Sequence, residues 1–208
     1  MKKISDSTIN RLSKYYRTLQ TLISKEVDTI SSEDIADIES ITAAQVRKDL
    51  SFFGTFGKRG LGYNTKDLRD SIGKILGLKK KWNVALVGVG NIGRALVNYH
   101  EFKVQGFNII ACFDSNPDKI GKRVENLTIH PERNLCKILK GERIDIVIIT
   151  VPADQAQTIV DQAVYCGVKA FLNFAPVSLK APEKVLIKNE NMSIELEALS
   201  YHLTNRLK

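Results

Sequence analysis

Residues 83–93 read Asn-Val-Ala-Leu-Val-Gly-Val-Gly-Asn-Ile-Gly, an apolar run that leads directly into three glycines spaced as GxGxxG. The run predicts a buried β-strand, and the glycines predict a tight turn into a helix. In such a turn Gly88 permits the backbone reversal, Gly90 lets the backbone approach a pyrophosphate, and Gly93 lets helix and strand pack closely. The order of strand, turn and helix therefore predicts a dinucleotide-binding loop.

The chain after this loop alternates between expected strands and helices. Further strands are expected at 107–114, 144–151, 168–174 and 185–188, and helices at 154–166 and 193–207. Alternation of this kind predicts an α/β fold with a doubly wound parallel sheet, here a Rossmann-type domain over residues 82–192. Residues 117–141 show no clear pattern, apart from helical spacing at 135–139.

An acidic residue and two strand ends complete the predicted nucleotide site. Asp114 ends the second strand, where a carboxylate accepts hydrogen bonds from the adenosine ribose and favours NAD over NADP, although Lys119 nearby leaves NADP open. The later strand ends reach the same edge of the sheet and are expected beside the nicotinamide, with ordinary strand-to-helix turns as the alternative. The predicted NADH- and NAD+-binding residues are Gly88, Val89, Gly90, Asn91, Ile92, Gly93, Asp114, Val151, Pro152, Phe174, Ala175 and Pro176.

The first 81 residues predict a different domain. Helical spacing is found at 5–25, 43–53 and 65–78, and a short helix follows Ser31. A segment rich in glycine and basic residues, 54–63, predicts a β-hairpin. These residues also carry 16 Lys/Arg against 10 Asp/Glu, a net charge of +6 of the +8 total. Helices, a basic hairpin and a charge excess predict a winged helix-turn-helix that binds DNA.

The helix at 43–53, capped by Thr42, is the expected recognition helix. On it Gln45 suits adenine, and Arg47 or Lys48 suits guanine or phosphate. Asp49 is expected either to orient a neighbouring cation or to accept from cytosine. The predicted DNA-binding residues are Gln45, Arg47, Lys48, Asp49, Ser51, Lys58, Arg59, Gly60 and Tyr63. The alternative is a small helical dimerisation domain with a solvated basic hairpin.

The sequence lacks the residues expected of an enzyme, of a metal or disulfide site, and of a secreted or membrane-spanning protein. None of the three histidines (His100, His130 and His202) falls at a strand's carboxyl end, so no catalytic acid or base is expected and the nucleotide is a ligand rather than a reagent. The three cysteines (Cys112, Cys136 and Cys166) form no metal or disulfide pattern, so reduced thiols are expected. No segment is long and apolar enough to be a signal peptide or a membrane span, which predicts a cytoplasmic protein.

Both sets of motifs match one family. The sequence resembles the Rex family of redox-sensing transcriptional repressors over nearly its whole length. The matching segments are Tyr15-Tyr16-Arg17, Val46-Arg47-Lys48-Asp49-Leu50-Ser51, Phe53-Gly54, residues 56–63, residues 88–96, Phe113-Asp114, Val151-Pro152-Ala153 and Asn173-Phe174-Ala175-Pro176-Val177. The resemblance implies a homodimer that exchanges its last helix (193–208) between subunits. It also implies that the protein binds palindromic operators near genes of fermentation and respiration. NADH is then expected to release the protein from these operators, and NAD+ to permit binding.

One position departs from the family pattern. The family places an Asp at the start of the last helix, where it interacts in a redox-dependent way with a Tyr and an Arg. Here the alignment puts Asn191 at that position, with Tyr99 and Arg17 present, and we predict that these three residues form the redox switch.

The competing interpretations of the whole chain are a small NAD-dependent oxidoreductase, a coenzyme A-binding protein without DNA binding, and an adaptor with an empty nucleotide domain.

Overall fold

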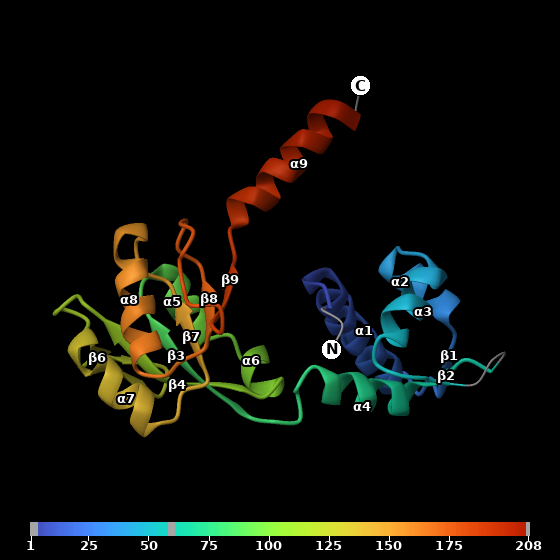
Figure 1. Ribbon diagram of the computed structural model, residues 1–208, viewed down its shortest axis with the longest axis horizontal. Coiled ribbons are helices and arrows are strands. Elements are labelled where there is room, and N and C mark those ends of the chain that lie inside the picture. Colours follow the sequence, from blue (N-terminus) through green and yellow to red (C-terminus); the bar gives the residue numbers. More distant parts are fainter. Residues whose placement is uncertain (1–3, 58–60, 207–208) are drawn as a thin grey trace. The chain divides into compact units, whose positions relative to one another are not determined.

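A computed structural model describes residues 4–57 and 61–206 (Figure 1). It divides into two compact units, Met1–Lys80 and Lys81–Lys208. Each unit has its own hydrophobic core, which is why each is described separately below.

The described part of the N-terminal unit contains four helices whose starts are encoded locally. They are α1 (Asp6–Ser24), α2 (Ser32–Glu39), α3 (Ala43–Ser51) and α4 (Thr65–Ile75). The side chains of Ser5, Ser31, Thr42 and Asn64 each accept a hydrogen bond from a backbone N–H in the first turn of the helix that follows. Such caps satisfy N–H groups that have no partner inside the helix. The four predicted helices are confirmed.

One apolar face of each helix forms the core of this unit. The side chains with at most 3% exposure are Leu12, Tyr15, Leu19, Ile35, Ala36, Val46, Leu50, Leu68 and Ile72. Val46 and Leu50 lie four residues apart and fix the buried side of α3. The opposite side of α3 is therefore left facing solvent, where Arg47, Lys48 and Ser51 are exposed.

The expected hairpin at 54–63 differs from the structure. Tyr63 and Asn64 form β2 (Tyr63–Asn64), which pairs antiparallel with β1 (Thr29–Ile30), just before α2. The glycine-rich residues described between α3 and β2 contain no strand, and the predicted contacts Lys58, Arg59 and Gly60 lie outside the described residues. Periodicity cannot reveal a two-residue strand whose partner lies more than 30 residues away.

The C-terminal unit has a seven-stranded sheet in the order β5-β6-β4-β3-β7-β8-β9. The strands are β3 (Trp82–Val87), β4 (Phe107–Asp114), β5 (Arg123–Val124), β6 (Leu127–Pro131), β7 (Ile146–Ile149), β8 (Ala170–Asn173) and β9 (Leu186–Asn189). All neighbouring pairs are parallel except β5 with β6. This is the Rossmann order, with the direction of winding reversing between β3 and β7, so the predicted doubly wound sheet is confirmed.

Helices cover the sheet and create two apolar layers. They are α5 (Asn91–Val97), α6 (Glu101–Val104), α7 (Leu135–Gly141), α8 (Ala153–Tyr165), the short 3₁₀ helix η1 (Glu132–Asn134) and α9 (Met192–Arg206). One core contains Leu135 and Leu139 of α7 with Ile159 and Val160 of α8, and the other lies on the face with α5 and α6. The helices α5, α7, α8 and α9 were expected, and α6 was not.

The patternless segment 117–141 holds β5, β6, η1 and α7. Its strands were missed because β5 has only two residues and β6 buries only Ile129 fully. Glu125, between the two strands, adopts φ +50°, a left-handed conformation that is uncommon for a residue other than glycine. Neither alternation nor a glycine turn marks this antiparallel pair in the sequence.

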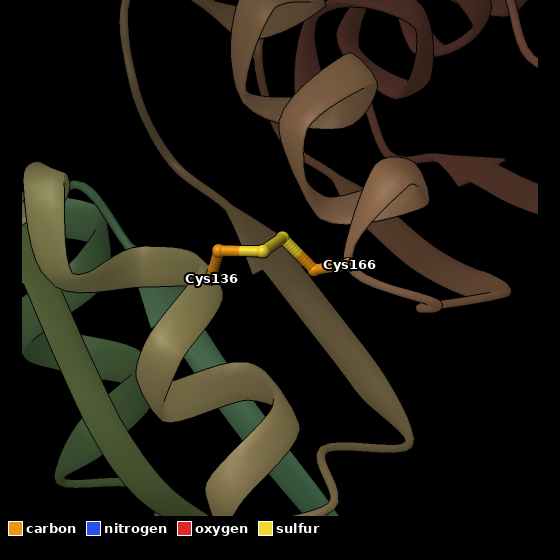
Figure 2. Close-up of a disulfide and its surroundings, with 2 residues drawn as sticks. All are labelled: Cys136 and Cys166. Carbon is orange, nitrogen blue, oxygen red and sulfur yellow. A yellow bond between two sulfur atoms is a disulfide. The ribbon is translucent and has the colours of Figure 1, made fainter.

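The expectation that all thiols are reduced is wrong for one pair. Cys136 at the start of α7 and Cys166 at the end of α8 form a disulfide with Cα atoms 5.4 Å apart (Figure 2). The helices pack together in the fold, which brings together cysteines that are 30 residues apart in sequence. Cys112 is free and buried, and burial raises the pKa of its thiol to about 12.

The last helix, α9, has no cover. All of its side chains that the structure describes are exposed, including Ile194, Leu196, Leu199 and Leu203 at 57–67%. Scattered exposed apolar residues are ordinary, but a whole apolar stripe usually marks an interface. Among the described residues, no helix combines the length and the apolar character needed to cross a membrane.

Candidate functional site

The carboxyl ends of the parallel strands surround a cavity of about 460 Å³ at the point where the winding reverses. A site for a small molecule typically has this size and this position in an open α/β sheet. The residues that line it are Gly88, Gly90, Ile92, Asp114, Ser115, Asn116, Lys119, Glu132, Thr150, Val151, Pro152, Gln155, Phe174 and Pro176.

The three glycines of the loop have different roles. Gly88 has φ +98°, and a Cβ there would lie 2.6 Å from the carbonyl oxygen of Thr150. A Cβ on Gly93 would lie 2.1 Å from the carbonyl oxygen of Gly88. Around Gly90, in contrast, nothing lies within 4 Å of a Cβ, although this residue lines the cavity. The fold thus requires Gly88 and Gly93, whereas only a closely approaching ligand requires Gly90.

The carboxylate of Asp114 is buried and almost fully bonded. Its Oδ2 accepts from the N–H of Val89 at 2.8 Å and from Nζ of Lys119 at 2.9 Å, and its Oδ1 accepts from the N–H of Asn116 at 2.9 Å. Burial acts to raise the pKa of Asp114, but these hydrogen bonds outweigh it and hold the pKa below its usual value. Asp114 is therefore an anion that ties the glycine loop to the end of β4.

Asn173 holds the turn after β8 against the cavity. Its side chain is fully buried. Its Nδ2 donates to the carbonyl of Val177 at 3.0 Å, and its Oδ1 accepts from the N–H of Ala175 at 2.9 Å. These bonds fix a turn whose members Phe174 and Pro176 face the cavity. The sequence motif contained Asn173, but its polar side chain gave no sign of this positioning role.

The cavity contains most of the predicted nucleotide-binding residues. Gly88, Gly90, Ile92, Asp114, Val151, Pro152, Phe174 and Pro176 line it, whereas Val89, Asn91, Gly93 and Ala175 do not. The lining residues missing from the predicted set are Ser115, Asn116, Lys119, Glu132, Thr150 and Gln155. Most of these lie within a few residues of predicted positions and are found by extending each strand end. Glu132 has no such signal, because it lies in the patternless segment.

In the N-terminal unit, α2 and α3 are joined by a short turn in which Ser40 is left-handed, at φ +53°. Arg47 of α3 donates from Nη1 to Glu33 at 2.9 Å and to Ser32 at 2.8 Å, so its guanidinium is held at the surface beside α2. Lys48 and Ser51 are also exposed, while Gln45 is half-buried. This arrangement presents a basic helix face of the kind that enters the major groove in helix-turn-helix proteins.

The prediction of a DNA contact for Asp49 requires correction, because its side chain has 0% exposure. Arg11 donates to both carboxylate oxygens at 2.6 and 2.8 Å, and Tyr15 and Gln45 donate at 2.9 and 2.8 Å. Burial acts to raise the pKa of Asp49, but these bonds outweigh it and lower the pKa. Asp49 orients neighbouring side chains, which was the other role considered for it, and Arg11 is the cation involved.

The residues of the predicted redox switch lie in both units. Arg17 belongs to α1, and Tyr99 is 53% exposed, with its ring 5.1 Å from Phe102 in an edge-on contact. Asn191 accepts from the N–H of Ser193 at 3.0 Å, at the start of α9. The role of these three residues stays a prediction. The expectation that no histidine falls at a strand's carboxyl end is wrong for His130, which is the penultimate residue of β6, with its ring centroid 5.9 Å from that of Phe113. His130 is not among the residues that line the cavity, which include no histidine. The described residues contain no cluster of His, Cys, Asp or Glu that could hold a metal.

Comparison with known proteins places these features in one family. A family model described as "Putative DNA-binding protein N-terminus" matches residues 3–51, and one described as "CoA binding domain" matches residues 79–177. The redox-sensing transcriptional repressor Rex of Desulforamulus reducens is 47% identical over 206 residues, which cover 99% of this chain and 98% of that protein. The Rex of Desulfitobacterium hafniense is 46% identical and covers 98% and 97%. The chain belongs to the Rex family.

Solved structures of another Rex-family repressor, RSP, extend this match to three dimensions. RSP in complex with NAD+ and operator DNA superposes with a TM-score of 0.94, at 37% identity, over 99% of this chain and 95% of that one. RSP in complex with NADH superposes with a TM-score of 0.90, at 35% identity, over 99% and 97%. The match covers both units, so the winged-helix and Rossmann assignments agree with those of a Rex repressor.

Proposed function

We propose that this protein is a DNA-binding transcriptional repressor that senses the ratio of NADH to NAD+ and is released from palindromic operators by NADH. One observation carries the proposal: a single chain joins a cavity lined by a GxGxxG loop to an exposed basic helix face. Residues 1–81 bind DNA, residues 82–192 bind NAD(H), and the protein acts in the cytoplasm. We further propose that it acts as a regulator and not as an enzyme, as its relatives named redox-sensing transcriptional repressors do.

In this proposal the cavity holds the dinucleotide along the strand ends. The pyrophosphate lies against Gly90, the adenosine lies toward Asp114, and the nicotinamide lies toward Phe174. The nicotinamide ring is uncharged in NADH and positive in NAD+. Burying an unpaired charge in the apolar surroundings of Phe174, Pro152 and Pro176 costs free energy, which favours the binding of NADH over NAD+.

The DNA-binding surface is the exposed side of α3. Arg47, Lys48 and Ser51 reach base edges or phosphates, with Gln45 at the edge of the surface. We further propose that Lys58, Arg59, Gly60 and Tyr63 contact the DNA backbone from the adjoining segment. A palindromic operator then requires two such helices, spaced by about one or more turns of DNA.

The second helix comes from a second copy of the chain. On α9 the side chains of Leu196, Leu199 and Leu203 are exposed along one side. Exchange of this helix between two subunits would cover that apolar side. A Leu199→Glu change should then convert dimers into monomers in sedimentation experiments. A monomeric wild-type protein would contradict the homodimer.

NADH and operator DNA are coupled through the dimer. A ligand that binds two conformations of the dimer with equal affinity does not shift the equilibrium between them. NADH must therefore prefer the conformation in which the two winged helices do not match the spacing of the operator half-sites. A coupling of about 1–3 kcal/mol corresponds to roughly 5–150-fold weaker DNA binding. We propose that Arg17, Tyr99 and Asn191 transmit this preference, with a neutral amide at Asn191 in place of the family's carboxylate.

A second candidate is coenzyme A binding, because the "CoA binding domain" model matches residues 79–177. The two ligands share an adenine and a pyrophosphate, so the glycine loop alone does not separate them. Coenzyme A carries a thiol-ended arm in place of the nicotinamide riboside, and it has an additional 3′-phosphate on its adenosine ribose. Competition titrations with NADH, NAD+ and coenzyme A therefore decide between them.

The main test is fluorescence anisotropy of a palindromic Rex-type operator at fixed salt, with NADH or NAD+ titrated in. We expect tight binding that NADH weakens and NAD+ does not. Arg47→Ala should weaken operator binding and leave NADH affinity intact, and Arg143→Ala serves as a matched control on the nucleotide-binding unit. Operator binding that ignores both nucleotides would overturn the sensor, and an unchanged Arg47→Ala would overturn the recognition-helix assignment.

A further inference from the structure

Glu132 lies in the nucleotide cavity at a position that the family motif does not include. It begins η1, directly after β6, and lines the cavity together with Asp114. In the register of the sheet, Asp114 pairs with Pro131, so Glu132 follows the direct neighbour of Asp114. The cavity thus has two carboxyl groups at its adenosine end.

The carboxyl group of Glu132 has a buried oxygen atom that lacks a hydrogen-bond partner within the described part of the chain. Its Oε1 is buried and accepts no hydrogen bond from any described residue. Burial first, and the charge of Asp114 second, raise the pKa of Glu132. A buried polar atom without a partner costs free energy, and native proteins seldom retain one without a use. The cost is explained if a ligand in the cavity interacts with this carboxyl group.

The charges around Asp114 show what Glu132 adds. Lys119 lies 2.9 Å from Asp114 and offsets its charge, while two backbone N–H groups also bond to that carboxylate. With Asp114 and Lys119 alone, this end of the cavity would be close to neutral and would not repel a phosphate strongly. Glu132, which has no ion-pair partner among the described residues, makes the local charge negative.

We propose that Glu132 is a specificity-determining residue that accepts a hydrogen bond from the 2′-hydroxyl of the adenosine ribose and excludes a 2′-phosphate, so that NADH is bound in preference to NADPH. The inference rests on the proposed function, because it concerns the same cavity. It assigns to Glu132 the discrimination that Asp114, paired with Lys119, performs only weakly.

The test is a Glu132→Gln substitution in the full-length protein, with dissociation constants for NADH and NADPH measured by isothermal titration calorimetry. The amide keeps the shape and removes the charge, so the preference for NADH over NADPH should fall by roughly ten-fold. Glu142→Gln, at an exposed carboxylate at the end of α7, is the matched control and should leave the preference unchanged. Thermal unfolding of all three proteins verifies that each is folded.

The outcomes separate the two levels of the proposal. An unchanged preference in Glu132→Gln, or an equal change in Glu142→Gln, overturns the role of Glu132 while the NADH sensor stands. A changed preference between NADH and its deamino analogue, with the NADPH ratio unchanged, would mean that Glu132 contacts adenine and would overturn the ribose assignment. A wild-type protein that binds neither NADH nor NADPH overturns the proposed function itself.

Discussion

Two alanine substitutions in the glycine loop should separate ligand binding from folding. At Gly90, which has φ −83°, a Cβ meets nothing within 4 Å, so Gly90→Ala should change the free energy of unfolding by no more than about 0.5 kcal/mol. The added methyl group occupies the space through which a pyrophosphate approaches the backbone. A displaced pyrophosphate should cost about 1.4–2.8 kcal/mol of binding, which is roughly 10–100-fold in the dissociation constant for NADH.

At Gly93 the same substitution produces a steric clash with the protein itself. The Cβ would lie 2.1 Å from the carbonyl oxygen of Gly88 and 3.1 Å from Oγ1 of Thr150. Carbon and oxygen atoms that are not bonded need well over 3 Å, so the backbone of the loop or of α5 must shift by about 1 Å. Forced overpacking of this kind typically costs about 1–3 kcal/mol. Gly93→Ala should therefore lower both stability and NADH affinity.

The assay is a pair of measurements on each variant: urea unfolding, and NADH titration followed by the fluorescence of the nucleotide. Operator binding without nucleotide serves as the control, and Gly90→Ala should retain it at the wild-type level. The reasoning fails if Gly90→Ala binds NADH as tightly as the wild-type protein. It also fails if Gly90→Ala loses as much stability as Gly93→Ala, since the two glycines would then have the same role.

Three further predictions concern stability. Asp49→Ala leaves Arg11 without its buried partner and should cost about 3 kcal/mol in urea unfolding; a loss below 1 kcal/mol would show that the network is not stabilising. The pKa of Asp49 is lowered by folding, so its contribution is complete above the unfolded pKa of about 3.9 and is lost as the pH falls below it; unfolding curves from pH 7 to pH 3 should show an acid loss that Asp49→Asn reduces. Reducing the Cys136–Cys166 disulfide, which spans 30 residues, should cost about 3–4 kcal/mol from loop entropy, and Cys136→Ser without reductant should match the reduced protein in calorimetry.

The parts of the fold that the sequence predicts are those with local causes. Caps at Ser31 and Thr42 start helices through hydrogen bonds that span only three residues. The apolar run at Ile146–Ile149 predicts a strand buried on both faces, since alternation is not needed there. The strand bounds of Phe107–Asp114 were predicted to the residue, because Gly106 precedes the strand and Asp114 ends it.

The parts that the sequence does not predict depend on packing between distant segments. The pairing of Ile30 with Tyr63 and the disulfide between Cys136 and Cys166 form only when helices or strands pack. Glu132 enters the cavity because β6 pairs with β4, and β6 itself is nearly invisible in the sequence. Likewise Asp49 looks like a surface residue in a basic motif, and only the tertiary position of Arg11 explains why it is buried.

Each functional motif of this chain mixes residues that the fold needs with residues that a ligand needs. In the loop, Gly88 and Gly93 are fixed by backbone contacts, while Gly90 faces open space. In α3, Asp49 is fully buried, while Arg47, two residues before it in the motif, is exposed. A sequence motif contains both kinds of residue, so a match to the motif alone does not identify a contact. Substitutions of the exposed member test function, because they leave the contacts of the buried member intact.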